Sequence, residues 1–120
     1  MKIKIYLNDG EDHFFGFHNK FANRPELTMV HSLETTDDFD GVLTEEKIFE
    51  ILAWVFYEFN IGESQHAKAY RAKLLRSLSV GDVVVVGETA WACESIGWKR
   101  LTTDELQAAI IWDDEMESVR

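Results

Sequence analysis

The chain has 120 residues, 46% of them hydrophobic and 12% aromatic, with a formal net charge of −10. This composition excludes a disordered chain, because there is enough apolar surface to form a core, and the length predicts a single domain over residues 1–120. The acidic charge disfavours binding to nucleic-acid phosphates and to anionic membranes.

The first half of the chain predicts two strands and one long helix. Residues 3–7 alternate apolar and polar side chains, the period of a half-buried strand, and residues 27–33 form a second candidate strand. Thr44 is a good N-cap for a helix that extends to Phe59. The apolar residues at the spacing of one helix face are Ile48, Ile51, Leu52, Val55, Phe56 and Phe59.

The second half begins with a short helix and continues as a β unit. Residues 67–75 are rich in Ala and Leu and predict the helix. Residues 80–82 (Val-Gly-Asp) are typical of a turn, and the four valines at 83–86 favour a strand. Residues 87–89 contain a Gly and predict a hairpin loop before a return strand over residues 91–96.

A third strand is predicted at residues 98–101, after the break at Gly97. Thr102 and Glu105 then have the spacing of a capping box that opens a C-terminal helix. Strands and helices are therefore segregated along the chain, which indicates an α+β fold. We expect a curled, largely antiparallel sheet packed against the long central helix, with the C-terminal helix at one end.

Two acidic clusters are candidate contacts for a basic protein partner. Their residues are Asp37, Asp38, Asp40, Asp113, Asp114 and Glu115. Carboxylates gathered on one face could engage a channel built from Lys and Arg, so one specific hypothesis is an acidic inhibitor that mimics nucleic acid. The plainer interpretation is a solvated loop and a frayed helix end.

An aromatic segment is the second candidate contact. Phe14, Phe15 and Phe17 lie in a short stretch that contains Gly and His and shows no clear period. These side chains either anchor a partner from an exposed apolar patch or pack in the core, as large apolar side chains usually do.

Basic and aromatic residues in the second half support an alternative function. Strands that combine such side chains bind single-stranded nucleic acid, although local salt bridges explain the charges equally well. The residues that would form this nucleic-acid surface are Arg71, Arg76, Trp91, Trp98, Lys99 and Arg100.

Catalytic, metal and cofactor motifs are not predicted. Cys93 lies in mid-strand with no base placed beside it, so we interpret it as a buried structural thiol. His13 and His18 lack the second ligand pair of a zinc site, and the glycines do not form a phosphate loop. A single Cys and the absence of a signal-peptide pattern favour a cytoplasmic protein without a membrane anchor.

Residues 76–83 read R-S-L-S-V-G-D-V and are followed by an aromatic return strand and by Gly97-Trp98. This stretch resembles small proteins of actinobacteria, their phages and plasmids, and it is similar to YodL-like domains of mobile-element proteins. The resemblance implies a phage or mobile-element setting and carries no catalytic residues onto this chain. Together these observations predict a non-enzymatic protein that binds another protein, with a single-stranded nucleic-acid module as the alternative.

Overall fold

The computed structural model describes residues 2–10, 13–18, 25–34 and 43–111. The order of strands and helices matches the order expected from the sequence, with one additional 3-10 helix. The elements are β1 (Lys2–Asn8), η1 (His13–Phe15), β2 (Leu27–Glu34), α1 (Glu45–Ile61), α2 (Gln65–Ala72), β3 (Val83–Val86), β4 (Thr89–Cys93), β5 (Trp98–Leu101) and α3 (Thr103–Ala109).

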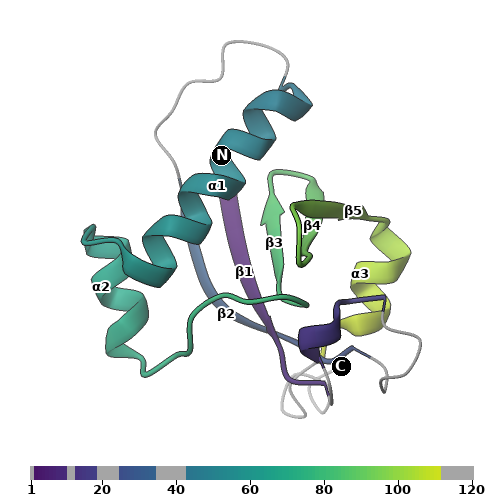
Figure 1. Ribbon diagram of the computed structural model, residues 1–120, viewed down its shortest axis with the longest axis horizontal. Coiled ribbons are helices and arrows are strands. Elements are labelled where there is room, and N and C mark those ends of the chain that lie inside the picture. Colours follow the sequence, from purple (N-terminus) through teal and green to yellow (C-terminus); the bar gives the residue numbers. More distant parts are fainter. Residues whose placement is uncertain (1, 11–12, 19–24, 35–42, 112–120) are drawn as a thin grey trace, which may run out of the picture.

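The strands form one antiparallel sheet in the order β2-β1-β3-β4-β5 (Figure 1). β1 lies inside the sheet, where Ile3 pairs with Leu33 of β2 on one side and with Val86 of β3 on the other. The α+β fold and the antiparallel sheet are therefore confirmed. The curl is confirmed only in part: the sheet is not strongly curled and stays open, with β2 and β5 as its edges.

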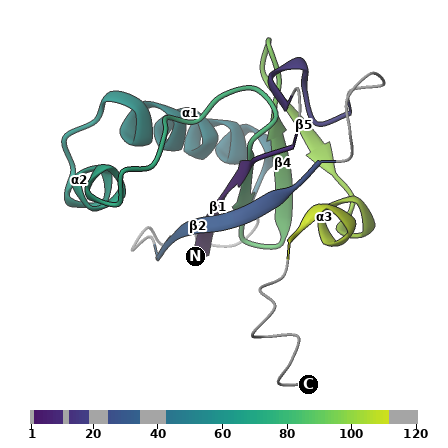
Figure 2. The same ribbon diagram turned by 90° about the horizontal axis from the view of Figure 1, so that it is seen from below.

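Helices cover both faces of the sheet (Figure 2). α1 packs on one face through its predicted apolar stripe, of which Leu52 and Val55 are fully buried against the sheet core. α2 joins this side through Tyr70, which contacts Phe59 of α1. α1 is thus a long helix laid on one face rather than a helix at the centre of the fold.

The opposite face is covered by α3. Because successive side chains of a strand point to opposite faces, Val84 and Val86 pack toward α1, and Val83 and Val85 pack toward α3. Ala109 of α3 packs in this second cluster. Burial on both faces explains why β3 reads as a continuous β-branched run instead of an alternating one.

Two predicted caps are confirmed. The Thr44 side chain accepts a hydrogen bond from the backbone N–H of Lys47 at 3.2 Å and so opens α1. At α3 the capping box is complete: Glu105 N–H donates to the Thr102 hydroxyl at 3.1 Å, and Thr102 N–H donates to the Glu105 carboxylate at 2.9 Å.

Several predicted boundaries differ from the structure, most of all the ends of α2 and β4. α2 ends at Ala72 instead of continuing to residue 75, and Leu74 beyond it has a positive φ of 61°. β4 ends at Cys93 instead of residue 96, because Glu94 N–H donates to the carbonyl of Gly97 and closes the hairpin loop there. Among the described helices, none has the length and apolar character needed to cross a bilayer.

Candidate interaction surfaces

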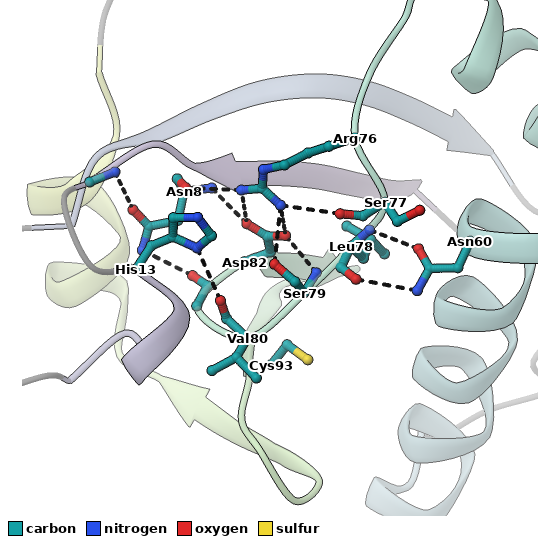
Figure 3. Close-up of polar contacts among 12 residues, drawn as sticks. Asn8, His13, Asn60, Arg76, Ser77, Leu78, Ser79, Val80, Asp82 and Cys93 are labelled. Carbon is teal, nitrogen blue, oxygen red and sulfur yellow. Dashed lines mark hydrogen bonds and ion pairs between the residues drawn. The ribbon is translucent and has the colours of Figure 1, made fainter.

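The R-S-L-S-V-G-D-V stretch folds around the buried carboxylate of Asp82, which is 1% exposed. Arg76 donates to both of its oxygens, from Nη1 to Oδ2 at 2.7 Å and from Nη2 to Oδ1 at 2.8 Å (Figure 3). The backbone N–H groups of Asn8 and Ser79 each donate to the same carboxylate at 2.8 Å. Four charge-assisted hydrogen bonds offset the cost of burying this charge.

Asn8 extends this polar network to the end of β1. Its amide Nδ2 donates to the carbonyl of Gly81 at 3.1 Å, and its Oδ1 accepts from Gly10 N–H at 2.9 Å. Arg76 Nη2 also donates to the Asn8 carbonyl at 2.9 Å. We call Asn8, Arg76, Ser79 and Asp82 the Asp82 cluster; it joins two segments that are more than 60 residues apart in the sequence.

The turn at Gly81 is required by a close approach of η1. Gly81 has φ +95°, and a Cβ at this position would lie 2.2 Å from the carbonyl oxygen of His13. Earlier in the segment between α2 and β3, the backbone of Leu78 forms two hydrogen bonds with the side chain of Asn60 of α1, at 2.7 and 3.2 Å. The motif is therefore explained by backbone geometry and by pairing within the fold.

The six residues of the predicted nucleic-acid surface do not share one accessible surface in the structure. Arg76 is held in the Asp82 cluster, which also raises the pKa of its guanidinium through the hydrogen bonds to that carboxylate. Trp91 is 4% exposed and packs in the core. Arg71 donates to the Gly62 carbonyl at 2.6 Å and lies 3.9 Å from Glu63. Only the members on β5 remain at an accessible strand.

Those β5 residues are Trp98, Lys99 and Arg100. Trp98 is half-buried, and its ring meets the ring of Phe56 edge-on at 6.3 Å. Lys99 and Arg100 are exposed, and neither has an ion-pair partner among the described residues. Two free cations beside one aromatic ring form a small basic edge.

The predicted aromatic anchors separate into two environments. Phe14 and Phe15 are 56% and 67% exposed on η1, and their rings lie 4.5 Å apart. Phe17 packs in the core on the α3 side of the sheet. Only the first two are therefore available to a partner.

The predicted acidic contacts, Asp37, Asp38, Asp40, Asp113, Asp114 and Glu115, lie outside the described residues. Most of the excess of acidic over basic residues lies in those undescribed segments. The acidic surface hypothesis therefore stays a prediction.

Among the described elements, α1 carries the most exposed large apolar side chains, and several of them lie on its outer side. Trp54, Tyr57 and Ile61 are 39%, 55% and 67% exposed on this side of the helix. Phe49 and Phe56 are also exposed and extend the apolar surface toward the sheet, where the Phe49 ring meets Trp91 edge-on at 5.2 Å. The predicted Ile48–Phe59 stripe describes the inner side of this helix except at Phe56, which was predicted to be part of the stripe and is exposed.

A signal for the outer side was nonetheless present in the sequence. Residues 51–61 (I-L-A-W-V-F-Y-E-F-N-I) contain only two polar side chains, Glu58 and Asn60. Asn60 is used to hold Leu78, and the Oε2 atom of Glu58 is buried. A helix segment that is apolar on nearly every side is normally buried on every side, whereas the described residues cover only one side of this one.

Acidic residues continue the outer side of α1 toward its N-terminus. Glu46, Glu50, Tyr57 and Ile61 are spaced so that they share one stripe, and all four are exposed. Lys47 lies 3.4 Å from Glu50 and offsets part of the charge. We call this stripe, together with Trp54, the α1 outer face.

The described residues do not form a site from a reactive thiol or from metal-ligating side chains. Burial, together with the nearby charges of Asp82 and Glu94, raises the pKa of the Cys93 thiol to about 11, which makes it a poor nucleophile near neutral pH. Among the residues that the structure describes, no three His, Cys, Asp or Glu side chains come together as metal ligands.

Comparisons with known proteins place the chain in no family. No protein-family model matches the sequence, and neither the curated proteins nor the solved structures contain a match to it. The assignment of a function therefore depends on the surfaces described above.

Proposed function

We propose that this chain is a non-enzymatic binding protein that docks a partner protein on the α1 outer face. One observation carries the proposal: the last three turns of α1 carry only two polar side chains, while the described residues bury one side of these turns. An apolar surface held on a rigid helix and ringed by polar groups is typical of a protein-binding site.

Charge along the α1 outer face favours a basic partner. Glu46 and Glu50 precede the apolar residues, and the net charge of −10 steers a cationic surface toward the molecule. Self-association through two antiparallel copies of α1 is disfavoured, because it would lay these carboxylates on the apolar end of the other copy. The phage or mobile-element setting rests on the sequence resemblance, and the docking surface does not depend on it.

Affinity capture from lysate of the source cells tests this proposal when the bait is varied. Tyr57→Gln with Ile61→Gln removes the apolar part of the face while keeping good helix formers. Ile96→Gln is the matched control, because Ile96 is 92% exposed in the hairpin loop between β4 and β5. We expect a basic protein that is retained by the unchanged chain and by the control bait and is lost from the double variant.

A third bait separates the two exposed aromatic regions. Phe14→Gln with Phe15→Gln removes the exposed pair on η1 and leaves α1 intact. Capture that depends on η1 but not on α1 would overturn the proposal, and so would a captured set that is the same for all baits. A partner lost through the α1 variant and retained through the η1 variant supports it.

The nucleic-acid alternative has a weaker basis in the geometry. Of its six predicted residues, the described contacts leave two cations free, on β5. Binding of single strands requires a cationic groove along several nucleotides. A titration with oligothymidine at low salt, where phosphate contacts are strongest, tests this alternative directly.

A further inference from the structure

The two edges of the sheet are finished differently in the described part of the chain. At β2, Lys73 donates to the Val30 carbonyl at 3.1 Å, and Ile111 N–H donates to the Leu27 carbonyl at 2.8 Å. These contacts, one from the segment after α2 and one from the segment after α3, occupy two carbonyl groups of β2. β5 pairs with β4 on one side, and no described residue bonds to its other side.

The register identifies which backbone groups of β5 point outward. Glu94 N–H bonds to the Gly97 carbonyl at 3.0 Å, and Ala92 and Ala90 pair with Lys99 and Leu101. Residues of an antiparallel strand alternate between bonding to one neighbour and to the other. The N–H and C=O groups of Trp98 and Arg100 therefore face away from the sheet, as an unpaired ladder.

Side chains around this ladder have a defined character. Trp98 and Arg100 lie on the α1 side of the sheet, since their register partners are Cys93 and the core residue Trp91. Lys99 lies on the opposite side, because alternate residues of a strand face opposite ways. A strand added here would meet one aromatic ring and one cation on one face, and one cation on the other.

We propose that β5 accepts an acidic extended segment of another protein as a sixth strand. Strand addition supplies backbone hydrogen bonds at an exposed edge, and side chains next to it select the sequence. The net charge of −10 repels an acidic segment at long range, but carboxylates directly opposite Lys99 and Arg100 form favourable cross-strand pairs at short range, where screening is weak. An apolar residue fits beside Trp98. The segment is therefore expected to carry two adjacent acidic residues next to an apolar one.

Other occupants fit this edge less well. Two copies of β5 paired together would bring Lys99 and Arg100 close to the same cations of the second copy, which is destabilising. A nucleic-acid strand would need more cations than these two, and Arg76 and Trp91 are held inside the fold. The β5 edge is separate from the α1 outer face, so the failure of either proposal leaves the other intact.

Peptide binding tests strand addition directly. The probes are fluorescein-labelled, capped octapeptides with the sequences TVEEITVT and TVKKITVT, measured by fluorescence anisotropy with the full chain. A third probe is TVEEITVT with N-methyl groups on alternate residues of one edge, which keeps the charges and removes the backbone donors. We expect the acidic peptide to bind at least about tenfold more tightly than the other two, since it alone has both charge complementarity and a free backbone edge.

Protein variants locate the binding on β5. Lys99→Glu with Arg100→Glu should weaken binding of TVEEITVT at least about tenfold, whereas Lys68→Glu on α2, also an exposed cation, should leave it within about twofold. Equal binding of the N-methylated peptide, equal effects of both variants, or no binding of TVEEITVT would each overturn the proposal. Binding of oligothymidine that the double variant abolishes, without peptide binding, would assign this edge to nucleic acid instead.

Discussion

The Asp82 cluster and the α1 outer face both reverse the usual placement of side chains, in opposite ways. At the first, an ionised carboxylate and an amide lie inside the protein; at the second, large apolar side chains lie in water. The polar groups inside are paired by Arg76 and by backbone donors from the same chain. For the apolar groups outside, the described residues provide no cover.

This difference separates a feature that stabilises the fold from one that we propose binds a partner. A buried charge that the chain satisfies itself contributes to the specificity of the fold and presents little to a ligand. An apolar surface that the chain leaves open gains free energy only when something else covers it. The following predictions test whether the first region affects stability, and whether the second region affects binding with little effect on stability.

The largest effect is expected inside the Asp82 cluster. Asp82→Ala leaves the Arg76 guanidinium and two backbone N–H groups without their acceptor, so we expect it to lower the free energy of unfolding by about 3–4 kcal/mol. Chemical denaturation followed by circular dichroism measures this loss. Glu88→Ala removes an exposed carboxylate and should stay within about 0.5 kcal/mol of the unchanged chain. A loss below about 1 kcal/mol at Asp82 would contradict the structural role of the cluster.

The next effect concerns the turn that precedes Asp82. Gly81→Ala combines a positive φ with a Cβ placed 2.2 Å from the His13 carbonyl oxygen, and we expect a loss of about 2–3 kcal/mol. Gly97→Ala is the matched control, because Gly97 also has a positive φ of 75° but has no atom within 4 Å of the added Cβ. Its loss, about 1 kcal/mol, measures backbone strain alone. Equal losses at both positions would show that η1 does not approach Gly81 closely.

His31 on β2 is a polar group that the fold satisfies only in part. Its Nδ1 accepts a hydrogen bond from Lys73 at 2.8 Å, while its Nε2 is buried and no described group bonds to it. The ring packs against Phe59 and Tyr70. Burial lowers the pKa of His31, and Lys73 and His66 lower it further.

The direction of this pKa shift predicts an acid-sensitive contribution to stability. The unfolded chain takes up the proton at a higher pH than the folded chain, so the contribution is present above the unfolded pKa of about 6.5 and is lost as the pH falls toward the folded pKa. His31→Gln keeps a hydrogen-bond acceptor for Lys73 and does not titrate. Between about pH 7.5 and about pH 5.5, the free energy of unfolding measured by chemical denaturation should fall more for the unchanged chain than for this variant. An equal fall for both proteins would contradict the prediction.

The smallest effect on stability is expected at the α1 outer face. Tyr57→Gln with Ile61→Gln should change the free energy of unfolding by less than about 0.5 kcal/mol, since both side chains are already in water. The same variant is expected to lose the partner in the capture experiment. A stability loss comparable to that of Asp82→Ala would mean that these side chains pack within the chain, and the contrast between the two regions would disappear.

Much of the local structure could be predicted because it depends on local chemistry. The caps at Thr44 and Thr102, the valine strand and the strand at residues 98–101 follow from side-chain type and spacing within a few residues. The end of β4 was predicted too late, because the hydrogen bond from Glu94 to Gly97 depends on how the loop closes. Strand order was not predicted, since no local pattern states that β1 lies between β2 and β3.

The candidate site was less predictable than the fold. No spacing rule links Arg76 to Asp82 or either of them to Asn8, so Arg76 was interpreted as a surface cation. The outer face of α1 was encoded in the sequence by an almost unbroken apolar run. An inward stripe explains only some of these side chains, and the others form the exposed side of the helix.

The central position of β1 has a consequence for synthesis. Its β3 partner begins at Val83, so on the ribosome the first strand and the whole of α1 are made before the middle of the sheet can close. Non-local pairing of this kind slows folding and exposes apolar segments while the chain is incomplete. During that interval α1, whose last turns carry only two polar side chains, has neither of its apolar sides covered by the sheet, and closing the sheet buries only the inner one.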